Sequence, residues 1–296
     1  MSNYSPSHFF EELNGISDAG VVRRDVLTRS ILGREIPVLR LGRGKKTVVY
    51  VSAQRGTEGI LSAVLLDFVR DFVGHYQKNG TVFDTALSYL FDERTVIVVP
   101  MLNPDGIGYA TEGVGKENPL FERVWRMNGE RELSSWEANA RGVDLTHNYS
   151  TGFFAHKELA EADGVLGGAP RGFGGEYPES EPESAALCRL LRFVGEDLLG
   201  VLVLQLGGGD IHCSCKDKLS AKTMAAGRIL GRATGYRLVS PEKTVPQGGL
   251  ADWCIDKLSR PAYRVECDAT KYTPERASAC LFESLRRAFY TFPFML

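Results

Sequence analysis

The sequence contains no hydrophobic run long enough to cross a membrane. A transmembrane helix needs about 20 consecutive apolar residues, and the longest candidate, Leu198–Leu206, is short enough to predict a buried strand. The opening residues 1–7 also lack the basic segment and the following apolar segment of a signal peptide. We therefore expect a cytoplasmic protein with no membrane partner.

Neither charge nor cysteine is present in excess. The 35 basic and 37 acidic residues leave a net charge of −2, which does not favour binding to nucleic acid. The six cysteines are spread through the C-terminal half of a 296-residue chain, unlike the dense framework of a small disulfide-bonded domain. We expect reduced thiols, and the oligomeric state is left open.

The motifs of nucleophilic catalysis and of phosphate binding are also missing. No Gly-x-Ser-x-Gly elbow occurs, and no cysteine has a convincing histidine partner in the sequence. Gly207-Gly-Gly-Asp210 follows a predicted strand, but it lacks the lysine and the helix start of a phosphate-binding loop. The chemistry must therefore come from other residues.

What is present is a regular alternation of apolar patterns typical of helices and strands. Helices are predicted near residues 7–13, 61–76, 83–92, 181–193, 221–234 and 275–290, and strands near 21–27, 34–41, 47–52, 94–100, 198–206 and 262–267. Strands that alternate with helices predict an α/β fold, a mostly parallel sheet covered on both faces. With no repeat and no evident linker, residues 1–296 are expected to form one domain, on which residues 1–45 pack as lead-in strands and helix.

Two long polar or glycine-rich stretches interrupt this pattern. Asn103-Pro-Asp-Gly106 predicts a turn, and residues 102–139 and 148–178 are predicted to be loops. Loops of this length inside a compact domain are usually functional. We expect them to wall a pocket at the ends of the strands.

The central stretch is Val51-Ser-Ala-Gln-Arg-Gly-Thr-Glu58-Gly-Ile60, directly after an apolar strand. A strand that runs through a glycine turn into a helix is where an open α/β sheet presents its chemistry. Glu58 falls at the start of the helix, where the helix dipole favours a carboxylate that could also bind a metal.

This stretch resembles the first metal-binding motif of the zinc carboxypeptidase family, the carboxypeptidase A-like enzymes. Five further segments resemble that family in the same order: Asn103-Pro-Asp-Gly106, Arg141-Gly-Val-Asp-Leu-Thr-His-Asn148, Gly175-Glu-Tyr-Pro-Glu-Ser-Glu-Pro-Glu183, Gly248-Gly-Leu-Ala-Asp-Trp253 and Arg260-Pro-Ala-Tyr-Arg-Val-Glu266. The likeness is greatest to bacterial members that look built for peptidoglycan-type peptides. It implies a single-domain, mixed, mostly parallel twisted sheet of about eight strands flanked by helices.

The resemblance also implies roles for particular residues. In the family, two histidines and a carboxylate hold zinc and leave a position open for the attacking water. Glu58 stands at the position of the carboxylate ligand, and Glu266 at that of the glutamate that takes the water's proton. Arg141 or Arg126 would stabilise the oxyanion; the sequence does not separate them.

The family's two zinc histidines are replaced. Arg55 stands at the first position, and an arginine offers only donors. Gln205 stands at the second, or Gly207 if the alignment slips by two residues. Neither is a competent zinc ligand, so Glu58 is the one ligand position retained and no cofactor is expected.

The clamp that binds the substrate's terminal carboxylate is altered as well. The usual asparagine and the basic residue after it are Thr146 and His147, the following Asn148 is retained, and the tyrosine of the mobile substrate loop corresponds to Thr244. His147 either binds a carboxylate or plays a plain hydrogen-bonding role.

Two retained glutamates in one pocket would repel each other unless a cation lies close. We hypothesise that Arg55 fills the space of the metal and pairs with Glu58, Glu266 or both. The alternative is that Arg55 points to solvent.

The other histidines and cysteines leave a further question open. We expect His8, His75 and His156 to be surface or loop residues. His212-Cys213-Ser-Cys215, with Cys267 beside Glu266, contains soft metal ligands, although the alternation along a predicted strand need not bring Cys213 and Cys215 to His212. Inert, buried thiols are the alternative to a relocated metal site.

Three functions therefore remain. The first is a carboxypeptidase-like protein that has lost zinc and hydrolysis and keeps a pocket for a peptide or amino-acid carboxylate. The second is an active metallocarboxypeptidase with unusual zinc ligands that acts on cell-wall-type peptides. The third is a non-catalytic scaffold with a vestigial pocket. We favour the first, because zinc needs about three protein ligands and the sequence offers one.

Overall fold

A computed structural model describes residues 4–16, 20–129, 132–213, 219–239 and 247–296 of the chain. One eight-stranded mixed sheet forms its centre, in the order β1-β2-β6-β3-β7-β10-β8-β9. The strands are β1 (Val22–Arg29), β2 (Glu35–Leu41), β3 (Lys46–Val51), β6 (Arg94–Val99), β7 (Leu198–Leu206), β8 (Asp210–His212), β9 (Arg237–Leu238) and β10 (Ala262–Cys267). The fold class expected from the sequence is confirmed.

The four central strands β6, β3, β7 and β10 run parallel, β1, β2 and β6 pair antiparallel in turn, and β8 pairs antiparallel with β10 and parallel with β9. The central strands are continuous apolar runs because both of their faces are covered; residues 48–51 and 96–99 are fully buried. The predicted hairpin of lead-in strands joins the edge of this same sheet.

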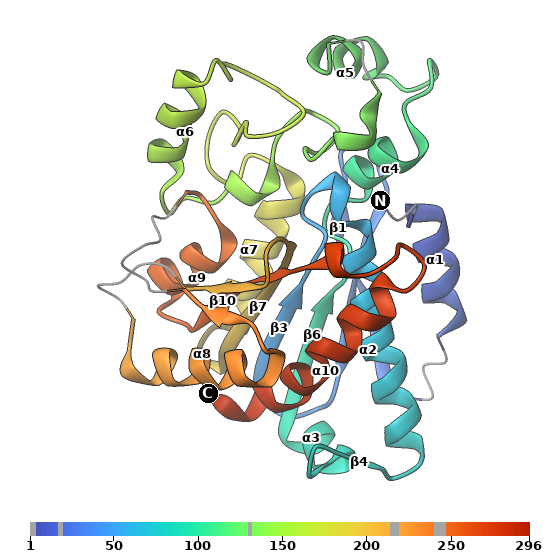
Figure 1. Cartoon of the computed structure of the whole chain (residues 1–296), viewed down its shortest axis with the longest axis vertical. Coiled ribbons are helices and arrows are strands. Elements are labelled where there is room, and N and C mark those ends of the chain that lie inside the picture. The colour runs from blue at the N-terminus through green and yellow to red at the C-terminus, as the bar shows by residue number, and fades with distance from the viewer. Residues whose placement is uncertain (1–3, 17–19, 130–131, 214–218, 240–246) are drawn as a thin grey trace.

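Helices cover both faces of the sheet (Figure 1). Helices α2 (Gly59–Gln77), α10 (Ala277–Met295) and α8 (Ala221–Thr234) pack side by side in front of it, and α7 (Pro182–Val194) lies behind. Helix α9 (Leu250–Leu258) packs on β7 and β10, and α1 (Pro6–Gly15) packs on α2 and on α4 (Pro104–Glu112). Tyr50, Phe68 and Phe289 make aromatic contacts between the sheet, α2 and α10.

Three segments differ from the sequence prediction. Asn103-Pro-Asp-Gly106 starts helix α4, because Asn103 caps it through a hydrogen bond from the N–H of Gly106 and Pro104 occupies the first turn. The predicted loops also contain α5 (Phe121–Met127) and α6 (Phe153–Ala162). The helix predicted near residue 83 is α3 (Leu87–Glu93), preceded by the small strands β4 (Thr81–Val82) and β5 (Thr85–Ala86).

The two loop regions stand above the strand ends at the top of Figure 1, where α4, α5 and α6 lie. Among the helices in the described parts of the chain, none is long and apolar enough to cross a membrane.

Candidate functional site

The carboxyl ends of β3, β7 and β10 meet beneath these loops. Glu58 lies in the 3-10 turn Gly56–Glu58 that follows β3, and Gln205 on β7 pairs in register with Glu266 on β10. This turn requires glycine at position 56, because a side chain there would place its Cβ 2.3 Å from the carbonyl oxygen of Trp136. The topology thus brings three of the residues named from the sequence to one edge of the sheet.

Glu58 is almost fully buried, and backbone groups occupy its carboxylate. Oε1 accepts from the N–H of Leu206 at 3.0 Å, and Oε2 accepts from the N–H of Arg55 at 3.2 Å. Burial raises the pKa of Glu58 to about 7, although the nearby Arg55 guanidinium and the two backbone donors lower it. The carboxyl group therefore takes up a proton more readily than an exposed glutamate does.

Arg55 turns inward from the same strand end. Its Nε lies 3.5 Å from Oε2 of Glu137, and its Nη2 donates to Oγ1 of Thr146 at 3.4 Å. Burial lowers the pKa of the guanidinium, but the carboxylates of Asp144, Glu58, Glu137 and Glu266 raise it by more. With 27% of the side chain exposed, Arg55 lies inside the site and does not extend into solvent.

Asp144 is a fully charged member of this group. Its Oδ1 accepts from the N–H and the hydroxyl of Thr146, and its Oδ2 accepts from the N–H of Gly172 at 3.1 Å. Burial alone would raise the pKa of Asp144, but His147, Arg55 and these hydrogen bonds lower it to about 2. Neither Asp144 nor Glu137 was singled out from the sequence. The capping pattern Asp-x-Thr was the available signal for Asp144.

His147 stacks on His156, with ring centroids 3.6 Å apart and ring planes 3° from parallel. The Nδ1 of His147 lies 2.6 Å from the carbonyl oxygen of Gln247, and Nε2 of His156 lies 2.8 Å from that of Gly172. Burial lowers the pKa of His147. The expectation that His156 is a surface or loop residue was wrong: it is a buried member of α6.

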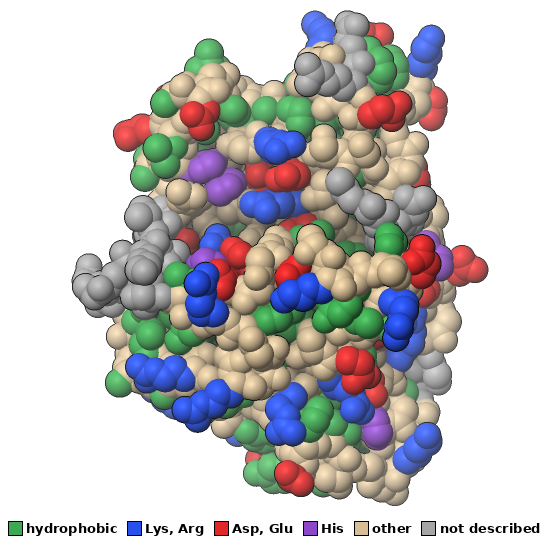
Figure 2. All heavy atoms as spheres, viewed as in Figure 1, with side chains coloured by type: hydrophobic (Ala, Val, Ile, Leu, Met, Phe, Trp, Pro, Cys, Tyr) green, Lys and Arg blue, Asp and Glu red, His purple; other side chains and the backbone are tan. Residues whose placement is uncertain are grey.

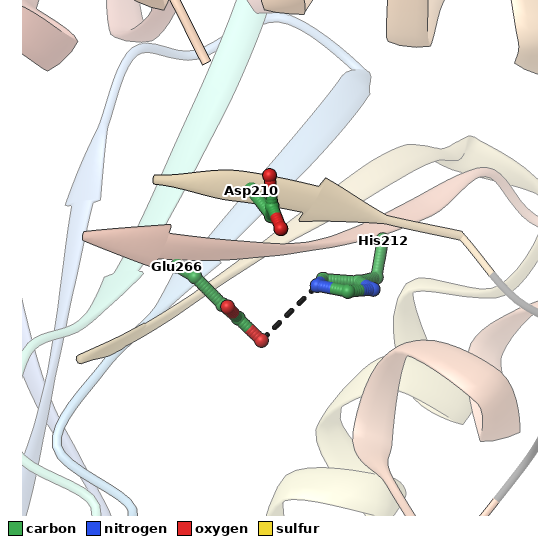
Figure 3. Close-up of side chains that lie close together, drawn as sticks. All are labelled: Asp210, His212 and Glu266. Carbon is green, nitrogen blue, oxygen red and sulfur yellow. Dashed lines mark ion pairs between the residues drawn. The ribbon is translucent and has the colours of Figure 1, made fainter. Parts of the chain in front are cut away.

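Glu266 faces the site from β10 and has three donors around it. Nε2 of His212 lies 3.1 Å and Nη2 of Arg264 lies 3.4 Å from Oε1, and the N–H of Gly208 donates to Oε2 at 3.4 Å. The close His212 imidazole is the main cause that lowers the pKa of Glu266. Figure 3 shows the His212 ring directed at this carboxylate, with Asp210 beside it.

Asp210, His212 and Glu266 are the one group of potential metal ligands found in the described parts of the chain, with ligand atoms within 4.8 Å of one another. Arg237 makes two hydrogen bonds to Asp210, at 2.7 and 2.9 Å, which already neutralise that carboxylate.

The set of soft ligands around His212 that the sequence left open does not form in the described part of the chain. Cys213 and Cys267 are fully buried, because the alternation of the strands turns them to the opposite face from His212 and Glu266. Cys215 lies outside the described residues. Cys213 and Cys267 are buried free thiols, as the other expectation from the sequence had it.

Other predicted residues have structural partners elsewhere. Arg141 forms an ion pair with Glu181 at 2.9 Å, and the side-chain amide of Asn148 donates to the carbonyl oxygen of Gly174 at 2.6 Å. Arg126 is exposed on α5, where its Nε donates to the carbonyl oxygen of Glu122. Thr244 lies outside the described residues.

The residues that do converge enclose a small cavity of about 30 Å³. The side chains around it are polar or charged on most sides: Arg55, Thr146, His147, Gln205, His212, Asp252 and Arg264, with Val203 and residues 249–251 completing the wall. This space holds about two water molecules or one small polar group. A hollow with blue, red and purple side chains at its rim is visible in Figure 2, below the upper loops.

The side chains at the positions that the sequence predicts to match the family's zinc ligands do not fit zinc. Arg55 presents a cation, and Gln205 presents an amide. A side chain at Gly207, the alternative position, would place its Cβ 2.7 Å from the Cβ of Glu266. Glu58 is thus the one suitable ligand, and both of its oxygens accept backbone hydrogen bonds.

A protein-family model matches more than half of the chain. Residues 12–210 match the sequence model of the family described as zinc carboxypeptidase. The chain is 26% identical over 269 residues to gamma-D-glutamyl-L-diamino acid endopeptidase 1 of Lysinibacillus sphaericus, a match that covers 90% of this chain but 66% of that protein.

Solved structures show the same fold at low sequence identity. Carboxypeptidase A from Helicoverpa armigera superposes with a TM-score of 0.64 and 18% identity, over 99% of this chain and 75% of that one. Murein-tripeptide amidase MpaA from Escherichia coli O157 superposes with a TM-score of 0.54 and 20% identity, over 90% of this chain and 96% of that one.

Proposed function

The chain belongs to the zinc carboxypeptidase family, and from that premise we propose that it is a member that binds a peptide or amino-acid carboxylate without zinc and without hydrolysis. The ligand's carboxylate takes the pocket at the ends of β3, β7 and β10. No metal-bound water forms at the family's position, because the side chains there supply one ligand where about three are needed.

The observation that carries this proposal is the placement of Arg55. Its guanidinium occupies the strand-end site among Glu58, Glu137 and Asp144 and interacts electrostatically with Glu266. A fixed cation here supplies positive charge that would otherwise come from a metal ion, and it repels any cation that enters. Arginine is also the side chain best suited to bind a carboxylate.

Thr146 and His147 line the pocket beside Arg55 and complete the proposed wall for the ligand's terminal carboxylate. The hydrogen bond from Arg55 to Thr146 (3.4 Å) and the ion-pair contact of Arg55 with Glu137 (3.5 Å) are long, so the guanidinium retains capacity for a stronger, charge-assisted acceptor.

The named activities of two similar proteins suggest the ligand class. One is an endopeptidase for gamma-D-glutamyl-L-diamino acid bonds and the other a murein-tripeptide amidase. We propose short cell-wall-type peptides, in a bacterial cytoplasm, as the ligands, and neither nucleic acid nor membrane as a partner.

One observation favours a second candidate, an active metallopeptidase with relocated ligands. Asp210, His212 and Glu266 are close enough to share an ion. Against this stand Arg237 on Asp210 and Arg264 on Glu266, whose charges disfavour a divalent cation.

Elemental analysis of protein purified without chelators, combined with calorimetric titration of a dipeptide and its C-terminal amide, tests the proposal. We expect zinc far below one atom per chain and binding of the free acid but not of the amide. Near-stoichiometric zinc, or equal binding of acid and amide, would overturn it.

A further inference from the structure

A groove of about 780 Å³ lies among α3, α8 and α10, towards the lower end of the molecule in Figure 1 and away from the strand-end site. Its apolar lining includes Tyr89 on α3, Ile229 on α8 and Phe294 on α10. Tyr89 and Ile229 are 56% and 43% exposed. Large apolar side chains that face solvent at a groove mark an interaction site, and a space of this size accepts several side chains of a partner.

Two arginines give this groove a positive charge. Arg232 on α8 and Arg287 on α10 line it, and Asp84 is the one acidic residue of the described lining. Arg287 lies over the ring of Phe83, 4.6 Å from its centroid, and no ion pair joins either arginine to another described residue. Figure 2 shows blue side chains, with green ones between them, on the lower half of this face, where α8 and α10 lie in Figure 1. An occupant should therefore combine apolar side chains with negative charge.

The outward face of α6 has the matching composition. Five exposed residues lie on it at the i, i+1, i+4, i+5, i+8 spacing of a single helix face: Phe154, Ala155, Glu158, Leu159 and Ala162. Phe154 and Leu159 are 68% and 55% exposed, and Glu158 lies between them on this face. No ion pair joins Glu158 to another residue in the described parts of the chain. Green and red side chains gather at the upper left of Figure 2, where Figure 1 places α6.

The two surfaces lie towards opposite ends of the molecule (Figure 1), so they cannot meet within one chain. Neither surface suits a copy of itself. Two α6 faces would bring Glu158 against Glu158, and two grooves would bring arginines together with no side chain to fill either groove. Like charges placed together across an interface are unfavourable. The complementarity therefore favours α6 of one copy against the groove of another.

We propose that copies of this chain associate head to tail, with the outward face of α6 of one copy seated in the α3/α8/α10 groove of the next. Phe154 and Leu159 pack on the apolar lining, and Glu158 faces the two groove arginines. This is helix-in-groove recognition, in which an amphipathic helix presents apolar anchors at helical spacing. Because the two partner surfaces differ, the contact is heterologous and repeats into a ring or an open chain.

The association should be weak and reversible. Helix α6 has 10 residues, so it makes a small interface compared with the roughly 1,200–2,000 Å² of stable complexes. Neither surface includes residues of the strand-end cavity. This inference therefore stands apart from the proposed function, and each can fail without the other.

Sedimentation velocity of the purified chain over a range of micromolar concentrations tests the proposal. We expect the average mass of the wild type to rise above that of one chain as the concentration increases. Two variants each disable one surface: the helix variant Phe154→Ser/Leu159→Ser and the groove variant Ile229→Glu/Arg232→Glu. All four side chains are exposed, so both variants should fold. Each variant alone should associate at least about tenfold more weakly than the wild type, a difference of about 1.4 kcal/mol.

An equimolar mixture of the two variants separates a lost contact from a damaged protein. The helix variant keeps its groove and the groove variant keeps its α6, so one intact contact can form between them. We expect this mixture to form a dimer with the affinity of the wild-type contact. The dimer should not grow further, because the two surfaces that it leaves free are the disabled ones.

Arg228→Glu is the matched control, because Arg228 is exposed on α8 but does not line the groove. It should associate like the wild type, and an equal loss in this variant would refute the role of the groove. A wild-type chain that keeps the mass of one chain at every concentration would refute the proposal. Loss of association in only one of the two double variants would indicate pairing of like surfaces and would also refute it, as would a mixture that stays monomeric.

Discussion

The Nε of Arg55 lies 3.5 Å from Oε2 of Glu137, a residue on the loop wall and not on the sheet. The sequence-based hypothesis paired Arg55 with Glu58, Glu266 or both. Among the described residues, the ion pair within 4 Å is with Glu137, while Glu58 accepts a hydrogen bond from the backbone N–H of Arg55. Arg55 therefore links the turn after β3 to the loop wall.

Restoring the two family histidines should restore zinc binding if the rest of the site is intact. In the double variant Arg55→His/Gln205→His, two imidazoles join Glu58, which gives the three ligands that a catalytic zinc site needs. We expect about one zinc per chain after incubation with zinc and dialysis, against almost none for the wild type, measured by elemental analysis.

The control for this prediction adds Glu58→Gln to the double variant, which should lose the zinc again. A double variant that stays folded but binds no zinc would contradict a vestigial metal pocket at these positions.

The buried carboxyl of Glu58 should make the protein less stable as the pH rises. Its pKa is raised from 4.5 in the unfolded chain to about 7, so its contribution is full below about pH 4.5 and is lost as the pH approaches 7. The shift corresponds to about 3 kcal/mol. We therefore expect that, in urea titrations between pH 4.5 and 8, the free energy of unfolding of Glu58→Gln rises relative to that of the wild type as the pH rises. A difference that stays constant with pH would refute the raised pKa.

Asp144 should act in the opposite direction. Its pKa is lowered from 3.8 to about 2, so it stabilises the folded state above about pH 4 and loses this contribution as the pH falls through 2. Asp144→Asn should cost about 2 kcal/mol at pH 7, and the deficit should shrink between pH 4 and 2. The exposed Asp163→Asn should show neither effect in the same denaturation series.

Glu183 should limit stability at alkaline pH from outside the site. It is fully buried in the first turn of α7, and neither of its carboxylate oxygens has a hydrogen-bond partner in the described structure. Burial raises its pKa to about 8. We expect Glu183→Gln to melt at a higher temperature than the wild type at pH 9 and at a similar temperature at pH 5. A variant less stable at both values would indicate a charged Glu183 with a partner.

Much of the scaffold could be predicted from local patterns. The bounds of β7, β10 and α8 agree with the prediction, because long apolar strands and strongly periodic helices carry most of their signal in their own residues. Short elements were missed: β8 and β9 have three and two residues, and β8 pairs with β10, which lies far away in the sequence, while β9 pairs with β8.

The sequence by itself determined the family likeness and the strand-end position of Glu58 and Glu266, and it predicts that residues which are poor ligands replace both zinc histidines. These follow from residue identity and spacing. Only the tertiary structure decided that Arg55 faces Glu137 and Thr146, that His147 stacks on His156, and that Arg264 lies beside His212. Each of these pairs joins segments that sheet order and loop packing bring into contact. The residues along the chain do not specify that contact by their identity or spacing.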